Sequence, residues 1–411
     1  MLLITMPRLL QINSTANWGS TGKIAEQIGE RAIAHGWESY IAYGRVANNS
    51  SSTLIRIGGR LSQAWHLMQT RLFDRHGRGS KCATKKLIRQ IEKIKPDIIH
   101  LHNIHGYYIN YPILFKYLNS TNIPIVWTLH DCWAFTGHCA HYMNCGCTKW
   151  QQECNNCPNK KVYPKALIDN SKYNYRHKQR LFTSRANRLI ITPVSQWLAD
   201  QVRSSFLSNS HIDHIYNGID TDVFRSIDTN SVRNRYSIEA QYIIVAVASV
   251  WDENKGLHDI LSLCTILPTG YAIIVVGLNN RQTKDLPGNV VAIPRTNSQE
   301  ELAEIYSCAD IVLSTSHQET FGLTIAEGMA CGVPAIVYNT TALPELITPD
   351  TGIVVEQGDI KGIAQAIETI CAKGKGYYRD ACRKYAVENF DKKRCFEKYI
   401  ALYDDLLTKK L

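Results

Sequence analysis

The stretch SHQETFGLTIAE, residues 316–327, does most to decide the fold. It continues an apolar run at 310–316 that predicts a buried strand, and it leads into a predicted helix. In an open parallel sheet this order places Glu319 in the loop at the carboxyl edge and Glu327 about two turns into the helix. The backbone N–H groups of residues 321–323 would then face outward at the helix start. Such groups favour an anion, for example a diphosphate.

The same alternation of strands and helices continues along the chain in both directions. We predict strands at 8–13, 39–43, 97–101, 124–129 and 189–194, and at 242–249, 271–277, 289–293, 310–315, 335–338 and 352–355. Repeated strand-helix units predict parallel sheets in both halves, and therefore the α/β class. Ser195 is a candidate N-cap for a helix over 197–206. A chain of 411 residues is long enough for about two or three domains, each with its own core.

Two glutamates eight positions apart around Phe-Gly, followed by GMACGVPAIV at 328–337, resemble the donor-site pattern of a known family. That family is the retaining GT-B glycosyltransferases called family 4, including bacterial enzymes for capsule and exopolysaccharide of the colanic acid type. Further matches occur in the expected order over roughly residues 8 to 405. They are the Gly-rich loop 19–22, the His-ended strands 97–102 and 125–130, the NGID sequence at 217–220 and the Lys-Gly pair at 255–256.

The resemblance implies a GT-B fold, in which two Rossmann-like, doubly wound domains face each other across a cleft. Residues 1–216 would form the acceptor-side domain, which contains a Cys-rich loop at 132–157. Residues 217–392 would form the domain that binds a nucleotide-diphosphate sugar. Residues 393–411 would be a terminal helix that returns to the first domain, with linkers near 214–220 and 389–394.

The resemblance also assigns roles to individual residues. The implied catalytic residues are His130, Glu319 and Lys255, and the implied donor-binding positions are Gly19, Gly22, Val250, Lys255, Glu319, Phe321, Gly322, Leu323 and Glu327. Glu319 would hold sugar hydroxyls and Glu327 the ribose hydroxyls, while Lys255 and the helix amides would stabilise the departing diphosphate without a divalent ion. The family usually carries an arginine at position 250. Its absence leaves the diphosphate to Lys255, the amides and Arg281.

The carboxylates argue against a glycosidase, because such an enzyme requires two carboxyl groups about 5 Å or ~6.5–9.5 Å apart across the scissile bond. Nothing in the sequence pairs Glu319 with a second carboxylate in that role. We therefore predict sugar transfer with retention and without a cofactor for the chemistry. The resemblance implies a glycan or polyprenyl-diphosphate-linked acceptor in surface polysaccharide synthesis. Two alternatives stay open: an isomerase of the UDP-sugar 2-epimerase kind, and a non-catalytic sugar-nucleotide-binding assembly factor.

The net charge of +10 raises the question of phosphate-rich partners. No nucleic-acid motif accompanies it, and the Gly-rich loop at 19–22 lacks the Gly-x4-Gly-Lys-Ser/Thr spacing of a Walker loop. A basic first half would suit contact with an anionic membrane, although ordinary solubility charge explains it equally well. No apolar run reaches the ~18 residues of a membrane helix, and the first residues lack a signal-peptide pattern. We expect a cytoplasmic enzyme at the inner face of the membrane.

Six of the thirteen cysteines crowd into residues 132–157, with two histidines among them. The spacing of four of them suits a tetrahedral structural zinc site, namely Cys139, Cys147, Cys154 and Cys157. Free thiols and disulfides are the alternatives. Disulfides would require export, and the remaining cysteines are dispersed singly, as is typical of a reduced compartment. His130 follows a predicted strand at its carboxyl end, which favours a site residue over a structural histidine.

Overall fold

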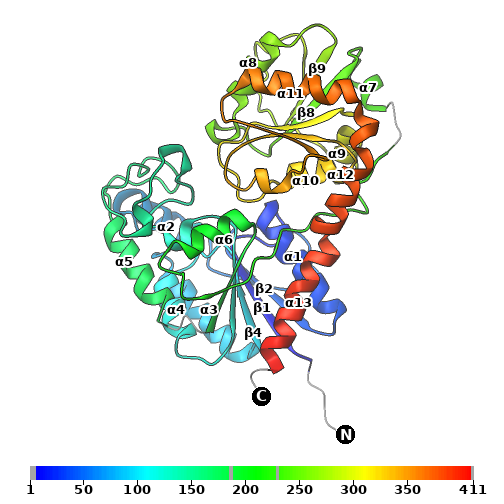
Figure 1. The fold of residues 1–411 in the computed structure, drawn as a ribbon. Helices are drawn as coiled ribbons and strands as arrows, with labels where there is room; N and C mark the ends of the chain where they lie inside the picture. The colour runs from blue at the N-terminus through cyan, green and yellow to red at the C-terminus, as the bar shows by residue number, and fades with distance from the viewer. Residues whose placement is uncertain (1–5, 185–187, 228–230, 409–411) are drawn as a thin grey trace. The chain divides into compact units, whose positions relative to one another are not determined.

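The computed structural model describes residues 6–184, 188–227 and 231–408. The chain forms two compact units, one from Met1–Tyr216 with Phe396–Leu411, the other from Asn217–Cys395. Each unit is built around one parallel sheet with helices on both faces (Figure 1). Among the described residues, no helix has the length and apolar character needed to cross a bilayer.

The first unit contains a seven-stranded sheet in the order β3-β2-β1-β4-β5-β6-β7, and all its strand pairs are parallel. The strands are β1 (Arg8–Asn13), β2 (Glu38–Tyr43), β3 (Thr53–Arg56), β4 (Ile98–Leu101), β5 (Ile125–Leu129), β6 (Leu189–Pro193) and β7 (His211–Ile212). The residues of β4, β5 and β6 are buried throughout because helices cover both faces of the sheet. The five strands predicted in this half are confirmed. The short edge strands β3 and β7 were not predicted.

Helices cover both faces of this sheet. They are α1 (Gly19–Ala34), α2 (Arg60–Phe73), α3 (Lys81–Ile94), α4 (Tyr111–Leu118), α5 (Ser171–Phe182), α6 (Gln196–Arg203) and α13 (Lys392–Thr408). Three short 3-10 turns lie between β5 and α5: η1 (Trp133–Phe135), η2 (Met143–Cys145) and η3 (Lys149–Gln151). Ser195 caps α6 as predicted, since its hydroxyl accepts a hydrogen bond from the Leu198 N–H at 3.1 Å.

The terminal helix α13 packs against the sheet of the first unit, on the face that α1 also covers (Figure 1). Its Tyr403 hydroxyl lies 2.6 Å from His100 Nδ1, and its Tyr399 hydroxyl lies 2.9 Å from Thr128 Oγ1. His100 Nε2 also meets Thr128 Oγ1 at 2.7 Å. These contacts occupy both ring nitrogens of His100, which therefore acts as a structural group that fixes α13 to the sheet.

The second unit contains a six-stranded parallel sheet in the order β10-β9-β8-β11-β12-β13. The strands are β8 (Tyr242–Val247), β9 (Tyr271–Val276), β10 (Val290–Ile293), β11 (Ile311–Ser314), β12 (Ala335–Tyr338) and β13 (Gly352–Val355), and all six were predicted. The helical segments are α7 (Ser231–Arg235), η5 (Glu253–Lys255), α8 (Leu257–Ile266), α9 (Gln299–Cys308), α10 (Leu323–Ala330), η6 (Pro344–Leu346), α11 (Ile360–Lys373) and α12 (Lys375–Phe390). Helices α8 and α11 lie together on one face, and α9, α10 and α12 lie on the other (Figure 1).

The strand order reverses once in each sheet, between β1 and β4 in the first unit and between β8 and β11 in the second. Loops that leave two such neighbouring strands run to opposite faces of the sheet. They open a crevice at the carboxyl edge, which is where open α/β sheets bind ligands. The loop after β8 carries Lys255, and the loop after β11 carries Glu319.

Candidate functional site

The ammonium group of Lys255 is in direct contact with the carboxylate of Glu319 in the second unit. Lys255 ends the 3-10 turn η5, which Asp252 caps by accepting a hydrogen bond from the Asn254 N–H at 2.9 Å. Gly256 then adopts φ +68°, and this left-handed residue turns the chain into α8. Both side chains of the contact are partly exposed, so a ligand can reach them.

Hydrogen bonds join the loop after β8 to the loop after β11 next to the Lys255–Glu319 ion pair. The Thr315 hydroxyl lies 3.1 Å from the Lys255 carbonyl and 3.0 Å from the Gly256 carbonyl. The His317 N–H donates to the Asn254 carbonyl at 2.7 Å, and the Gln318 amide donates to the Asn254 side chain at 2.7 Å. The position of Lys255 relative to Glu319 is therefore set by the backbone and not by the long side chains alone.

Helix α10 begins directly after this loop. Gly322 is its N-cap at φ +105°, and no side chain caps the helix. Glycine is favoured here, because this φ strains any residue with a side chain and a Cβ atom would lie 2.8 Å from Leu346 Cδ1. Phe321 is buried against the ring of Phe390, with the ring centroids 5.5 Å apart. The N–H groups of the first turn thus start at the carboxyl edge of the sheet, beside Glu319.

Glu327 lies in the second turn of α10, as predicted. It accepts a hydrogen bond from the hydroxyl of Tyr306 on α9 at 3.2 Å. The next residue, Gly328, packs against β11, and a Cβ atom there would lie 2.9 Å from Val312 Cγ1. The small residues of α10 therefore allow the helix to approach the sheet closely, and this approach fixes the height of Glu327 above β11.

Val250 occupies the position at which the family that this sequence resembles usually has arginine. Its side chain is 64% exposed, whereas the following Trp251 is buried and donates through its indole N–H to the Val276 carbonyl at 2.8 Å. The Gln282 amide donates to the Trp251 carbonyl at 2.8 Å, which ties the loop with Arg281 to the loop with Lys255. Arg281 itself is exposed.

His130 follows β5 at the carboxyl edge of the first sheet. Its Nε2 lies 3.1 Å from Nδ1 of His102, whose other nitrogen lies 3.0 Å from the side-chain oxygen of Gln11. Burial lowers the pKa of His130 to about 4 although Asp131 acts in the opposite direction, so the ring is neutral near pH 7. A neutral imidazole has one N–H donor and one nitrogen acceptor, so at a sheet edge it can hydrogen-bond to a polar ligand.

The Gly-rich segment 19–22 lies at the same edge, but it forms the first turn of α1 and not the predicted loop. Gly19 begins α1 at φ +65°, and a Cβ atom on Gly22 would lie 2.6 Å from Thr15 Oγ1. Asn13, the last residue of β1, accepts a hydrogen bond from the Asn103 N–H at 3.3 Å, which joins the end of β1 to the loop after β4. The structure thus gathers the predicted residues into two groups. His130 and the glycine segment 19–22 both lie at the carboxyl edge of the first sheet, while Lys255 lies with Glu319, Glu327 and the start of α10 in the second unit.

Three positioning groups were not predicted from the sequence. They are Thr315, which fixes the Lys255 loop, Tyr306, which orients Glu327, and Thr341, whose hydroxyl accepts from the Glu319 N–H at 2.9 Å. Thr315 ends a predicted strand in a run of small hydroxyl residues, so the sequence held a signal for it. Tyr306 and Thr341 lie far from the motif in sequence and carry no such signal.

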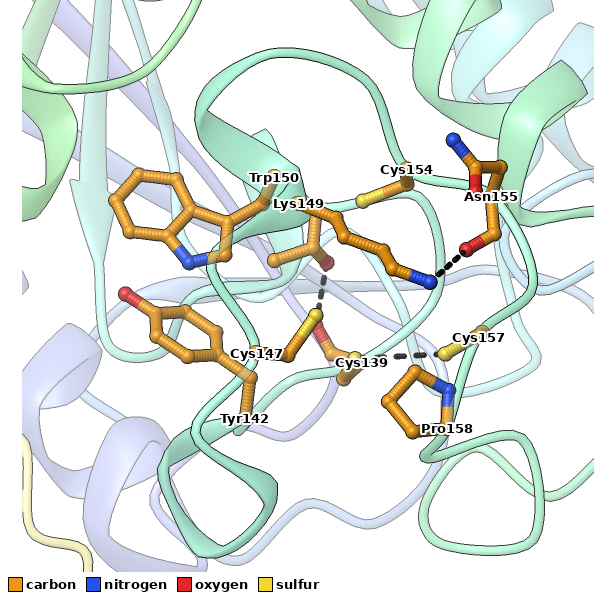
Figure 2. A pocket seen from close by; sticks show the side chains of 10 residues that line it. Cys139, Tyr142, Cys147, Lys149, Trp150, Cys154, Asn155, Cys157 and Pro158 are labelled. Carbon is orange, nitrogen blue, oxygen red and sulfur yellow. Dashed lines mark hydrogen bonds between the residues drawn. The ribbon is translucent and has the colours of Figure 1, made fainter.

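The four cysteines predicted as metal ligands line one small pocket in the loop between β5 and α5, with a cavity of about 10 Å³ (Figure 2). All thirteen cysteines lie in the described part of the chain, and none of them forms a disulfide there. In the described part of the chain, no three His, Cys, Asp or Glu side chains lie close enough together, as they stand, to hold a metal ion.

Comparison with known proteins assigns the chain to a family. Residues 25–223 match the model of Glycosyltransferase Family 4, and residues 228–389 match that of Glycosyl transferases group 1. The chain is 25% identical over 374 residues to the putative colanic acid biosynthesis glycosyl transferase WcaC of Escherichia coli K12, covering 87% of this chain and 89% of that protein.

Two solved structures share the fold. Sucrose-phosphate synthase of Thermosynechococcus elongatus superposes with a TM-score of 0.74 at 17% identity, covering 98% of this chain and 100% of the other. Anabaena Alr3699/HepE in complex with UDP gives a TM-score of 0.67 at 15% identity, covering 97% and 100%. The predicted GT-B type, two Rossmann-like α/β domains, is confirmed. The chain belongs to the family 4, group 1 glycosyltransferases and is a hexosyltransferase-type enzyme of class EC 2.4.

Proposed function

We propose that the enzyme transfers a sugar, with retention of configuration, from a nucleotide-diphosphate sugar to a glycan or lipid-linked acceptor in surface polysaccharide synthesis. The likeness to a colanic acid biosynthesis glycosyl transferase supports the polysaccharide acceptor. The Anabaena protein of similar fold was solved with UDP, which supports a nucleotide donor.

The observation that carries the proposal is the pairing of Lys255 with Glu319 at the strand-order reversal of the second sheet. A cation, a carboxylate and the N–H groups of a helix start meet there. A diphosphate would replace Glu319 as the partner of the Lys255 ammonium and would also face the α10 amides. The released Glu319 carboxylate would accept hydrogen bonds from sugar hydroxyls.

The chemistry follows from where negative charge develops. When the bond between the sugar and the diphosphate breaks, charge accumulates on the departing phosphate oxygen. Fixed donors at that position stabilise the transition state more than the ground state. We assign this role to Lys255 and to the N–H groups of 321–323. Glu327, oriented by Tyr306, would hold the ribose hydroxyls and so fix the nucleotide end of the donor.

We assign the sugar and acceptor side to the first unit. His130, held neutral and hydrogen-bonded to His102, would contact the transferred sugar. The first turn of α1, residues 19–22, would contact the acceptor side, because a Cβ atom on Gly19 would meet nothing within 4 Å and the backbone there is open to a ligand.

An exposed apolar stripe on α2 supports a lipid-linked acceptor at an anionic membrane. The stripe consists of Leu61, Trp65, Met68 and Leu72, spaced four, three and four residues apart on one helix face. Leu167 and Ile168 extend it, because their N–H groups bond to carbonyls of α2 at 2.8 Å and 3.4 Å. Residues 56–95 carry eleven Lys and Arg against two acidic residues. Apolar side chains beside basic ones are typical of surfaces that bind anionic lipid.

We expect the Leu61→Gln/Trp65→Gln double variant to bind phosphatidylglycerol vesicles at least tenfold more weakly than wild type, because a fully buried large apolar side chain contributes about 1.5–3 kcal/mol. Vesicle co-sedimentation measures this affinity. Tyr377→Gln, which removes an exposed aromatic residue from the second unit, serves as the matched control and should bind normally. Equal wild-type binding to phosphatidylcholine vesicles, or concentration-dependent self-association through the stripe, would contradict the membrane assignment.

The donor proposal is tested by a thermal-shift panel of UDP-, GDP- and ADP-sugars on the full chain. One nucleotide class should raise the melting temperature, because a ligand that binds only the folded state stabilises it. The Glu319→Gln variant should retain the shift from the free nucleoside diphosphate and lose the extra shift from the sugar. If no sugar nucleotide stabilises the protein, the proposal fails. Epimerised donor without added acceptor would show an isomerase instead.

A further inference from the structure

The loop between β5 and α5 has little regular structure to hold it. Residues 132–170 contain only three 3-10 turns of three residues each. A connection of this length without helices or strands needs other contacts to stay ordered, since few backbone groups bond to each other within it. The pocket lined by four cysteines lies in this loop (Figure 2).

Two of the thiols already stand at the spacing of metal ligands. Cys139 Sγ lies 3.9 Å from Cys157 Sγ. In a tetrahedral site with Zn–S bonds of about 2.3 Å, neighbouring sulfur atoms lie about 3.8 Å apart. Cys147 and Cys154 line the same cavity, and Figure 2 shows all four side chains placed around it. Four thiols from separate parts of the loop therefore converge on one small space.

Hydrogen bonds from the backbone and from Lys149 fix the positions of the thiols. The Gly137 N–H donates to Cys154 Sγ at 3.2 Å, a type of hydrogen bond that stabilises negative charge on a ligating sulfur. Lys149 donates to the carbonyls of Asn155 and Asn156 at 3.1 Å and 3.2 Å, and so fixes the turn between Cys154 and Cys157. The Lys149 side chain also borders the pocket, where its charge would offset the thiolates.

We propose that Cys139, Cys147, Cys154 and Cys157 bind one zinc ion that holds this loop in place. The Cys139–Cys157 pair provides two ligands, and side-chain rotation brings Cys147 and Cys154 to the metal. Each thiol gives its proton to solvent as its Zn–S bond forms, so four protons leave and the four-thiolate site carries a net charge of −2. The zinc is structural, because all four ligand positions belong to the protein.

The test uses the full chain, produced without a histidine tag and purified under reducing conditions. Elemental analysis should give one zinc per chain. Cys157→Ser and Cys147→Ser should lower this to well below one half. Cys145→Ser is the matched control, because Cys145 lies in the same loop, does not line the pocket and should leave the zinc content unchanged. Loss of zinc in the control and its retention in Cys147→Ser would overturn the assignment.

A second measurement keeps the inference testable if the serine variants do not fold. Wild-type protein loaded with Co²⁺ in place of zinc should show thiolate-to-cobalt absorption and the visible bands of tetrahedral cobalt. Removal of the metal by a chelator should lower the melting temperature and expose four additional thiols to a thiol reagent. Wild-type protein that takes up neither zinc nor cobalt, or a mass two units lower that reveals a Cys139–Cys157 disulfide, would refute the zinc site. None of these results depends on sugar transfer.

Discussion

Replacement of Lys255 by alanine is expected to lower kcat for sugar transfer by about 10²–10³-fold, the usual cost of removing one fixed donor from a developing oxyanion. The expectation rests on the contact of the Lys255 ammonium with Glu319, which a donor diphosphate would take over. Donor affinity should fall as well, because Glu319 then meets the anionic diphosphate without a cation beside it. Steady-state kinetics with the sugar nucleotide selected by the thermal-shift panel measures both effects.

Two controls separate this effect from a general loss of charge or stability. Lys361→Ala removes an exposed lysine from α11 in the same unit and should leave kcat unchanged. Lys255→Arg keeps the charge but changes its geometry, so it should recover only part of the activity. A Lys255→Ala enzyme with wild-type kcat would show that the diphosphate is held elsewhere.

The second large effect is expected for Gly256→Ala. Gly256 has φ +68°, which costs an alanine about 1–2 kcal/mol. In addition, the new Cβ atom would lie 2.2 Å from the carbonyl oxygen of Thr315, a backbone atom that can move only with β11. We expect the melting temperature of the variant to fall by at least about 4 °C. Transfer should fall by about 10²-fold, because the displaced loop carries Lys255 away from the donor.

Comparison with Gly358→Ala separates the steric cost of a Cβ atom at position 256 from the conformational cost of the left-handed backbone. Gly358 also has a left-handed backbone, with φ +81°, but a Cβ atom there would meet nothing within 4 Å. The two variants therefore share the conformational cost and differ in the clash with Thr315. Calorimetry and kinetics should show a smaller loss of stability and full activity for Gly358→Ala. Equal behaviour of the two variants would mean that the Lys255 loop does not depend on this close approach.

The fold could be predicted largely because its strands are buried on both faces. Runs such as YIIVAV at 242–247 are apolar throughout, and the turns between them contain glycine or proline. Of the two edge strands that were not predicted, β7 has only two residues, which is too few to show a pattern. The terminal helix was expected from residue 393, and α13 begins at Lys392, with one residue between it and the end of α12.

The candidate site could be predicted only where its residues lie in one motif. Glu319, Glu327 and the start of α10 are close in sequence, so their spacing fixes their geometry. The contact of Lys255 with Glu319 joins residues 64 positions apart. The family resemblance implies that both residues meet the donor, but it did not predict this contact. Tyr306 could not be foreseen, because its role depends on how α9 packs against α10.

The central claim is that a nucleotide diphosphate binds between the ammonium group of Lys255 and the first turn of α10. A crystal structure of the full chain with the nucleoside diphosphate that stabilises it most would test this claim most directly. We predict phosphate oxygens within hydrogen-bond distance of Lys255 Nζ and of backbone N–H groups at 321–323, with the Glu319 carboxylate no longer paired to Lys255. A diphosphate bound elsewhere, with the Lys255–Glu319 contact intact, would contradict the account.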